Sequence, residues 1–178
     1  MSFPISFLLL PLPFVLLYFE GKNFKQSLEY LGFSREKPAR QALDGLKLLA
    51  LFLAAFFCLG AALQVLGLLD SYKVVEVVRA QPFLVLAAAV TLAPVAEEMF
   101  FRGYLQKKIG VVLSSVIFAA VHYAYGSVAE VIAAFLMGLI AGWWVKKHGR
   151  LASAVIAHAL WNAASIILAL TILGPSLP

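Results

Sequence analysis

The sequence predicts an all-α fold, a polytopic bundle of about six transmembrane helices with a polar site inside the membrane. Two observations support this prediction. The 178 residues are 63% hydrophobic and only 13% charged, whereas soluble domains are about 45–50% apolar. In addition, the charged residues gather in short stretches between long apolar runs. An apolar excess of this size indicates that lipid, rather than water, covers much of the surface.

Six segments come close to the roughly 20 apolar residues that a helix needs to cross a bilayer core. In chain order they are residues 3–19, 46–69, 83–106, 110–125, 128–145 and 151–173. The stretch 20–47 is too polar to cross, so we expect it on the cytoplasmic face, partly as an amphipathic helix. The single cysteine, Cys58, excludes an internal disulfide and is expected to be a small buried hydrophobe.

Basic residues alternate along the predicted connections. Successive connections and the C-terminal tail hold 6, 2, 3, 0, 3 and 0 Lys or Arg residues, which fits six spans with the basic loops in the cytoplasm. The net charge of +5 therefore reflects membrane orientation, and no nucleic-acid partner is expected. Ser127 and Glu130 have the spacing of a capping box that starts the fifth span. His148 is assigned no chemistry, because Gly149 is expected to cap a helix that ends there.

Polar side chains interrupt three of the spans. A charged group in the hydrocarbon region costs at least ~2.5 kcal/mol, so each is a functional candidate by default. The third span reads A-P-V-A-E-E-M-F-F-R-G, the fourth F-A-A-V-H and the sixth H-A-L-W-N. The candidate residues are Glu97, Glu98, Arg102, His122, His158 and Asn162.

Helical geometry brings these groups to a similar depth. Glu97 and His122 lie at matching distances on either side of a hairpin apex near residues 109–110, roughly 19 Å from it. We therefore expect them to face each other. His158 and Asn162 are four residues apart, so they share one helix face, roughly 12–18 Å from the cytoplasmic loop at Arg150.

The same spacing rule separates the two glutamates. Glu98 and Arg102 are four apart and can neutralise each other within one helix. Glu97 is rotated by ~100° from Glu98 and is free to point elsewhere, although the two carboxylates could exchange roles. Phe118 and His122 also share a face.

Glutamate and histidine beside a confined water form a general-base arrangement, and His158 with Asn162 could donate hydrogen bonds to an oxyanion. This set, with no nucleophilic side chain, describes hydrolysis by activated water. The other protease types lack their signatures. No G-x-S-x-G surrounds a serine, as a serine type would need, and the only aspartates (Asp44 and Asp70) lie in loops or at span ends, not inside spans as an aspartyl type needs. The H-E-x-x-H motif of a zinc type is absent. A two-histidine, one-carboxylate metal site formed by Glu97, His122 and His158 remains an alternative.

Three motifs, E-E-M-F-F-R, F-A-A-V-H and H-A-L-W-N, resemble the E-E-x-x-x-R, F-x-x-x-H and H-x-x-x-N/D signatures of the CAAX prenyl protease and bacteriocin-processing (CPBP, Abi) family, in the family's order. The resemblance covers about residues 83–165. The family contains glutamate-type intramembrane endopeptidases that work without a catalytic metal, and other members confer immunity to peptides or act on sorting tails.

The resemblance implies a role for each candidate residue. Glu97 and His122 would activate water, His158 and Asn162 would stabilise the oxyanion, and Glu98 and Arg102 would support the site, with no cofactor. The substrate would be a membrane-bound protein or peptide, of CAAX or sorting-tail type, in the lipid bilayer. A non-catalytic immunity or scaffold protein is the alternative.

The chain is expected to form one integral membrane domain over residues 1–178. Residues 1–82 would be variable N-terminal helices with the cytoplasmic amphipathic loop, and residues 83–173 the catalytic core. The chain has fewer spans before the first motif than the prenyl-protein branch of the family. This small size favours a prokaryotic inner membrane.

Overall fold

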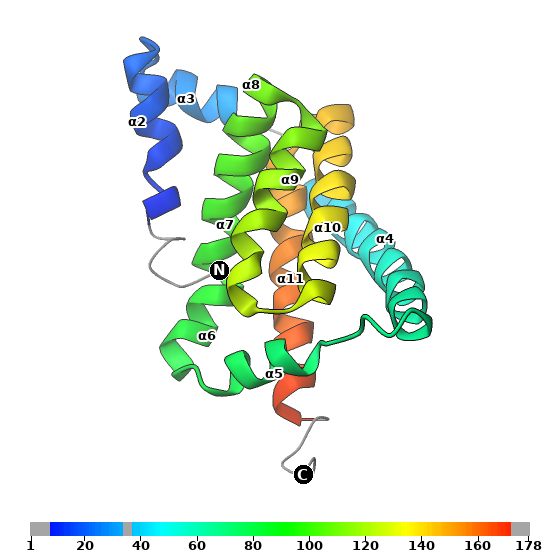
Figure 1. The fold of residues 1–178 in the computed structure, drawn as a ribbon. Helices are drawn as coiled ribbons and strands as arrows, with labels where there is room; N and C mark the ends of the chain where they lie inside the picture. The colour runs from blue at the N-terminus through cyan, green and yellow to red at the C-terminus, as the bar shows by residue number, and fades with distance from the viewer. Residues whose placement is uncertain (1–7, 34–36, 172–178) are drawn as a thin grey trace.

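The computed structural model describes residues 8–33 and 37–171 (Figure 1). Every regular element in these ranges is helical, which confirms the all-α prediction. In chain order the elements are α2 (Leu12–Phe19), α3 (Phe24–Leu31), α4 (Pro38–Val65), α5 (Tyr72–Arg79), α6 (Phe83–Val90), α7 (Leu92–Glu98), the π-helix η1 (Met99–Leu105), α8 (Gln106–Ile109), α9 (Val111–His122), the short 3₁₀ helix η2 (Tyr123–Tyr125), α10 (Val128–His148) and α11 (Leu151–Thr171).

Three of the described helices, α4, α10 and α11, are long and apolar enough to cross a membrane, and a fourth span forms if α6 and the helix that follows it are taken together. The apolar stretch Val111–Tyr125 is shorter. The predicted fifth and sixth spans correspond to α10 and α11. Of the predicted first span, residues 3–7 lie outside the described residues, and the remainder holds only the eight-residue α2.

The predicted third span is bent by 41° between α6 and α7. Pro94 has no N–H to donate to a carbonyl of the preceding turn, and proline commonly bends a helix at this point. The Thr91 hydroxyl instead donates to the Ala87 carbonyl at 2.8 Å. A continuous apolar run therefore forms two helical pieces, and the second piece carries the glutamates.

The predicted cytoplasmic stretch 20–47 divides into two parts. Its first part contains α3, which begins at a capping box in which the Asn23 and Gln26 side chains each accept a backbone N–H. Residues 38–47 form the first turns of α4, which starts at Pro38 and continues without a break into the apolar run. Proline fits the first turn of a helix, where its missing N–H has no partner in any case.

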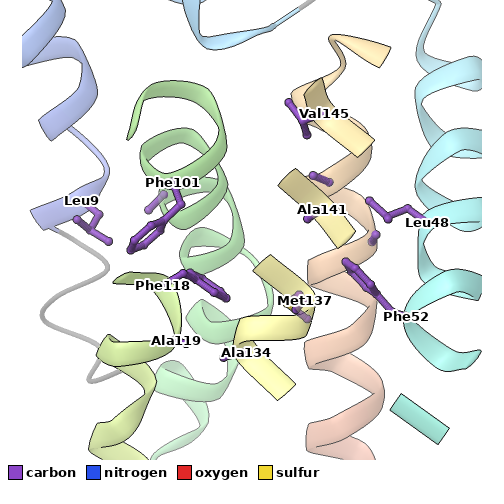
Figure 2. Close-up of a cluster of buried hydrophobic side chains, with 13 residues drawn as sticks. Leu9, Leu48, Phe52, Phe101, Phe118, Ala119, Ala134, Met137, Ala141 and Val145 are labelled. Carbon is purple, nitrogen blue, oxygen red and sulfur yellow. The ribbon is translucent and has the colours of Figure 1, made fainter. Parts of the chain in front are cut away.

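Small residues hold the bundle together. The buried cluster shown in Figure 2 combines aromatic side chains of η1 and α9 with alanines of α9, α10 and α11. A Cβ atom built on Gly138 would lie 2.7 Å from the Ser115 Cβ, so only glycine permits α9 and α10 to approach this closely. The prediction that Cys58 is buried is wrong, since it is exposed on α4. Lipid is the natural neighbour of that face.

Helix ends behave as their sequences predict. Gly149 has a positive φ of 67° and caps α10 directly after His148. Ser127 caps the start of α10 and accepts the Glu130 N–H at 3.1 Å. The predicted helix start and end are therefore confirmed, although of the predicted capping box only the bond to the Ser127 side chain is present.

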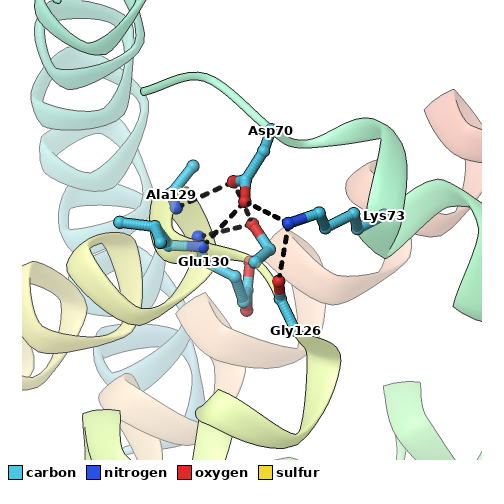
Figure 3. Close-up of polar contacts among 7 residues, drawn as sticks. Asp70, Lys73, Gly126, Ala129 and Glu130 are labelled. Atoms are coloured by element: carbon cyan, nitrogen blue, oxygen red, sulfur yellow. Dashed lines mark hydrogen bonds and ion pairs between the residues drawn. The ribbon is translucent and has the colours of Figure 1, made fainter. Parts of the chain in front are cut away.

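A carboxylate from another part of the chain reinforces the start of α10 (Figure 3). Asp70 accepts hydrogen bonds from the Ser127 hydroxyl at 2.7 Å and from the Val128 and Ala129 N–H groups at 3.0 Å. Lys73 donates both to Asp70, at 3.1 Å, and to the Gly126 carbonyl, at 3.0 Å. The bond from Ser127, with those from the backbone, holds the pKa of Asp70 well below its ordinary value of 3.8. Asp70 thus fastens the α4–α5 connection to α10.

Candidate active site

The first candidate motif lies where α7 passes into the π-helix η1. Glu97 and Glu98 end α7, and Arg102 lies within η1. All three side chains are buried, with exposed fractions of 4%, 0% and 2% respectively. π-helical turns are rare and frequently occur at functional sites. Three formal charges are therefore sequestered inside an apolar bundle at one unusual turn of helix.

Glu98 and Arg102 form the ion pair that their spacing predicts. The Arg102 Nη1 atom lies 3.0 Å from Glu98 Oε1, and the guanidinium lies 4.1 Å from the centre of the Phe118 ring. The Nη1 contact is an ion pair by distance but does not meet the angles of a hydrogen bond. Nη2 of Arg102 and Oε2 of Glu98 also have no hydrogen-bond partner among the described residues. The pair is neutralised by charge but keeps unused hydrogen-bonding capacity.

His158 lies between the two carboxylates. Its Nδ1 atom is 2.9 Å from Glu98 Oε1, and its Nε2 atom is 3.9 Å from Glu97 Oε2. Because a carboxylate oxygen accepts, the ring donates through Nδ1 and turns Nε2 toward Glu97. α11 thus delivers His158 to the glutamates of α7, a meeting that the estimated depths predict.

His122 is the last residue of α9, and it contacts Phe118, whose ring in turn contacts His158. Its Nδ1 atom donates to the Phe118 carbonyl at 2.8 Å, which leaves Nε2 for other partners. The two rings are 4.5 Å apart between centres, and the Phe118 ring also meets His158 edge-on at 6.2 Å. The predicted shared face of Phe118 and His122 is therefore present. A direct contact between His122 and Glu97 stays a prediction.

Asn162 is placed differently from the other candidates. It is half-buried, and its side-chain amide donates to the Ala89 carbonyl at 2.9 Å, just before the bend between α6 and α7. It follows His158 by one helical turn, as predicted, but this contact ties α11 to the broken span. The amide carries a second N–H, so a role toward an oxyanion stays a prediction.

The donor set does not form a ready metal site. Across residues 8–33 and 37–171, no three His, Cys, Asp or Glu side chains are arranged to hold an ion. The proposed metal ligands Glu97, His122 and His158 therefore do not converge as a metal site requires.

Several site neighbours were not predicted as functional. Tyr125 stacks on His122 with ring centres 6.0 Å apart, and Glu130 interacts electrostatically with Glu97 and His158. The capping spacing accounted fully for Glu130, so the sequence offered no signal for its second environment. Ser114 is buried and donates to the Phe101 carbonyl of η1 at 2.9 Å. A serine in an apolar run is too common for sequence analysis to single it out.

The fold and this cluster define the class: an integral membrane protein with a charged site inside a helical bundle. The family model of Type II CAAX prenyl endopeptidase Rce1-like proteins matches residues 79–164. This match confirms the resemblance drawn from the three motifs, all of which lie within the matched residues.

Two further comparisons add to the family match. The chain is 40% identical over 73 residues to "Uncharacterized protein YpbD" of Bacillus subtilis (strain 168), a stretch that covers 38% of this chain and 36% of that protein. The chain thus matches little more than a third of the length of this curated relative. No solved structure was found to match.

Proposed function

We propose that the protein is an intramembrane endopeptidase that hydrolyses a peptide bond of a membrane-associated protein or peptide, using water activated by Glu97. One observation carries this proposal: two glutamates, an arginine and a histidine, all buried in an apolar bundle, are linked pair by pair at 2.9 to 3.9 Å. Burying such charges costs free energy that apolar side chains would not cost. The cluster is therefore expected to perform chemistry.

The contacts favour Glu97 over Glu98 as the base. Glu98 is committed to both Arg102 and His158 through Oε1. Glu97 lies on the other side of His158, with its Oε2 atom 3.9 Å from Nε2. We therefore assign the orienting role to Glu98 and the role of base to Glu97.

The proposed reaction proceeds by direct attack of water. Glu97, assisted by Nε2 of His122, takes one proton as the water oxygen bonds to the peptide carbonyl carbon. His158, protonated on both ring nitrogens so that Nδ1 keeps its bond to Glu98, donates from Nε2 to the negative oxygen of the tetrahedral intermediate, and Asn162 donates its second amide N–H. The C–N bond then breaks as the proton held by Glu97 passes to the leaving nitrogen, which gives a carboxylic acid and an amine; the acid then passes its proton to the amine. Glu98 and Arg102 orient His158.

A peptide-cleavage assay tests this function. The wild type, Glu97→Gln and the exposed control Glu76→Gln would be reconstituted in liposomes with prenylated and unprenylated tail peptides. Mass spectrometry would identify the products, and thermal melts would confirm folding. We expect cleavage by the wild type and Glu76→Gln, and a loss of about 10²- to 10⁴-fold in Glu97→Gln. Undiminished cleavage by folded Glu97→Gln would refute the assignment. A wild type inactive on all peptides would favour an immunity or scaffold role.

A further inference from the structure

A buried serine outside the three motifs, Ser114, contacts the backbone of the π-helix η1, which carries Arg102. Ser114 lies in the first turn of α9 with 3% of its surface exposed. Its hydroxyl donates to the Phe101 carbonyl at 2.9 Å, across from α9 to η1. The same carbonyl accepts the N–H of Gln106, five residues further on, which is a π-type bond. Ser114 therefore binds a carbonyl that defines the π-helical turn.

This turn sets the position of the charged pair. Phe101 directly precedes Arg102, and its ring meets Phe118 edge-on with centres 5.0 Å apart. Arg102 lies over the Phe118 ring and against Glu98. A shift in the Phe101 carbonyl would consequently move Arg102 relative to both of its neighbours.

The far end of the turn is anchored in a similar way. The side chain of Gln106 donates to the Gly142 carbonyl of α10 at 3.1 Å, and Gln106 is buried. Two side-chain hydrogen bonds thus hold the π-helix. Ser114 of α9 donates to its Phe101 carbonyl, and Gln106, at its C-terminal end, donates to α10. A widened helical turn is less stable than an α-helical one, so these bonds are expected to maintain it.

The adjacent residue provides a matched comparison. Ser115 is as buried as Ser114, but its hydroxyl donates to the Val111 carbonyl of its own helix at 2.8 Å. It packs against Gly138 of α10 through its Cβ, which an alanine would retain. The two serines differ chiefly in whether the hydroxyl reaches the π-helix.

We propose that Ser114 is a positioning residue for the site: its bond to the Phe101 carbonyl holds the π turn that keeps Arg102 against Glu98 and Phe118. The effect on catalysis rests on the proposed peptidase function. The effect on the backbone does not.

Two measurements on Ser114→Ala and Ser115→Ala test the proposal. Hydrogen exchange followed by mass spectrometry would report on the amides of residues 99–106. We expect faster exchange there in Ser114→Ala and wild-type exchange in Ser115→Ala. In the cleavage assay, Ser114→Ala should lower kcat by about tenfold or more with little change in KM, because the geometry of the site changes and not the binding surface. Ser114→Thr keeps the hydroxyl and should retain most of the activity.

The outcomes separate this proposal from the peptidase function. Unchanged exchange over residues 99–106 in Ser114→Ala, or equal exchange and kcat effects in the two alanine variants, would overturn the positioning role. If the wild type cleaves no peptide, the peptidase function fails, and exchange alone decides whether Ser114 holds the π turn.

Discussion

Two carboxylates in this protein, the half-buried Asp70 and the fully buried Glu98, have opposite environments. Asp70 uses both oxygens fully, accepting from the Ser127 hydroxyl, two backbone N–H groups and Lys73. Glu98 is more deeply buried, and yet its Oε2 atom and the Nη atoms of its partner Arg102 lack a hydrogen-bond partner among residues 8–33 and 37–171. The first carboxylate lies at an end of the bundle and the second in its interior.

The difference separates a structural carboxylate from a site. Native proteins satisfy nearly all buried polar atoms, and exceptions call for an explanation. Asp70 is explained by what it caps, because the free N–H groups of α10 need an acceptor. Glu98 and Arg102 have no such role in closing a helix end. Their unused capacity fits groups that also respond to a reacting neighbour.

The largest stability effect is expected at the interior pair. Arg102→Leu would leave Glu98 buried without its cation, so we predict a destabilisation of about 3–5 kcal/mol. Thermal melts in detergent would measure it. The double variant Arg102→Leu with Glu98→Leu should recover much of the loss, since no charge is then stranded. A double variant no more stable than Arg102→Leu would contradict the pairing.

The second largest stability effect is expected at Gly103, where η1 packs against α3. A Cβ on Gly103 would lie 3.0 Å from the Leu31 carbonyl oxygen of α3. Gly103→Ala should therefore push α3 from η1 and cost about 1–3 kcal/mol. Gly60→Ala is the control, because a Cβ there meets nothing within 4 Å. Equal melting temperatures for the two variants would show that α3 does not press on η1.

The capping carboxylate should have a smaller effect. Asp70→Asn removes the ion pair with Lys73 and weakens the cap, and we predict a loss of about 1 kcal/mol at neutral pH. The pKa of Asp70 in the folded protein lies below its ordinary value of 3.8. Its contribution is therefore complete above that pH and is lost as the pH falls below it. The difference in melting temperature between wild type and variant should shrink between pH 7 and pH 3; a constant difference would contradict this.

Asn162 should show the smallest stability effect and an informative effect on activity. Asn162→Ala removes one bond to Ala89, and such interhelical bonds contribute about 0.6 kcal/mol in membranes. If Asn162 also stabilises the oxyanion, kcat should fall about 10²- to 10³-fold. Melts and kinetics on one preparation would compare the two. A kcat that follows stability alone would make Asn162 only a link between α11 and α6.

Sequence patterns predict some features of the fold and of the buried cluster but not others. Apolar runs predict α10 and α11 well, because span length is set by the bilayer. Helical spacing also predicts the Glu98–Arg102 pair and the placement of His158 near the glutamates. The π-helix was not predicted, because M-F-F-R-G-Y-L has the pattern of an ordinary helix. Its hydrogen bond from Ser114 and its close packing against Leu31 involve residues from elsewhere in the chain. The Asp70 cap was not predicted either, because its partners are 57 to 59 residues away.

The central claim is that the interior cluster is catalytic and the Asp70 turn is structural. The most direct test compares Glu97→Gln with Asp70→Asn, both shown to be folded by thermal melt, in one liposome assay on a cleaved tail peptide. We predict that Glu97→Gln loses about 10²-fold or more of kcat and that Asp70→Asn stays near the wild type. Similar activities in the two variants would contradict the account.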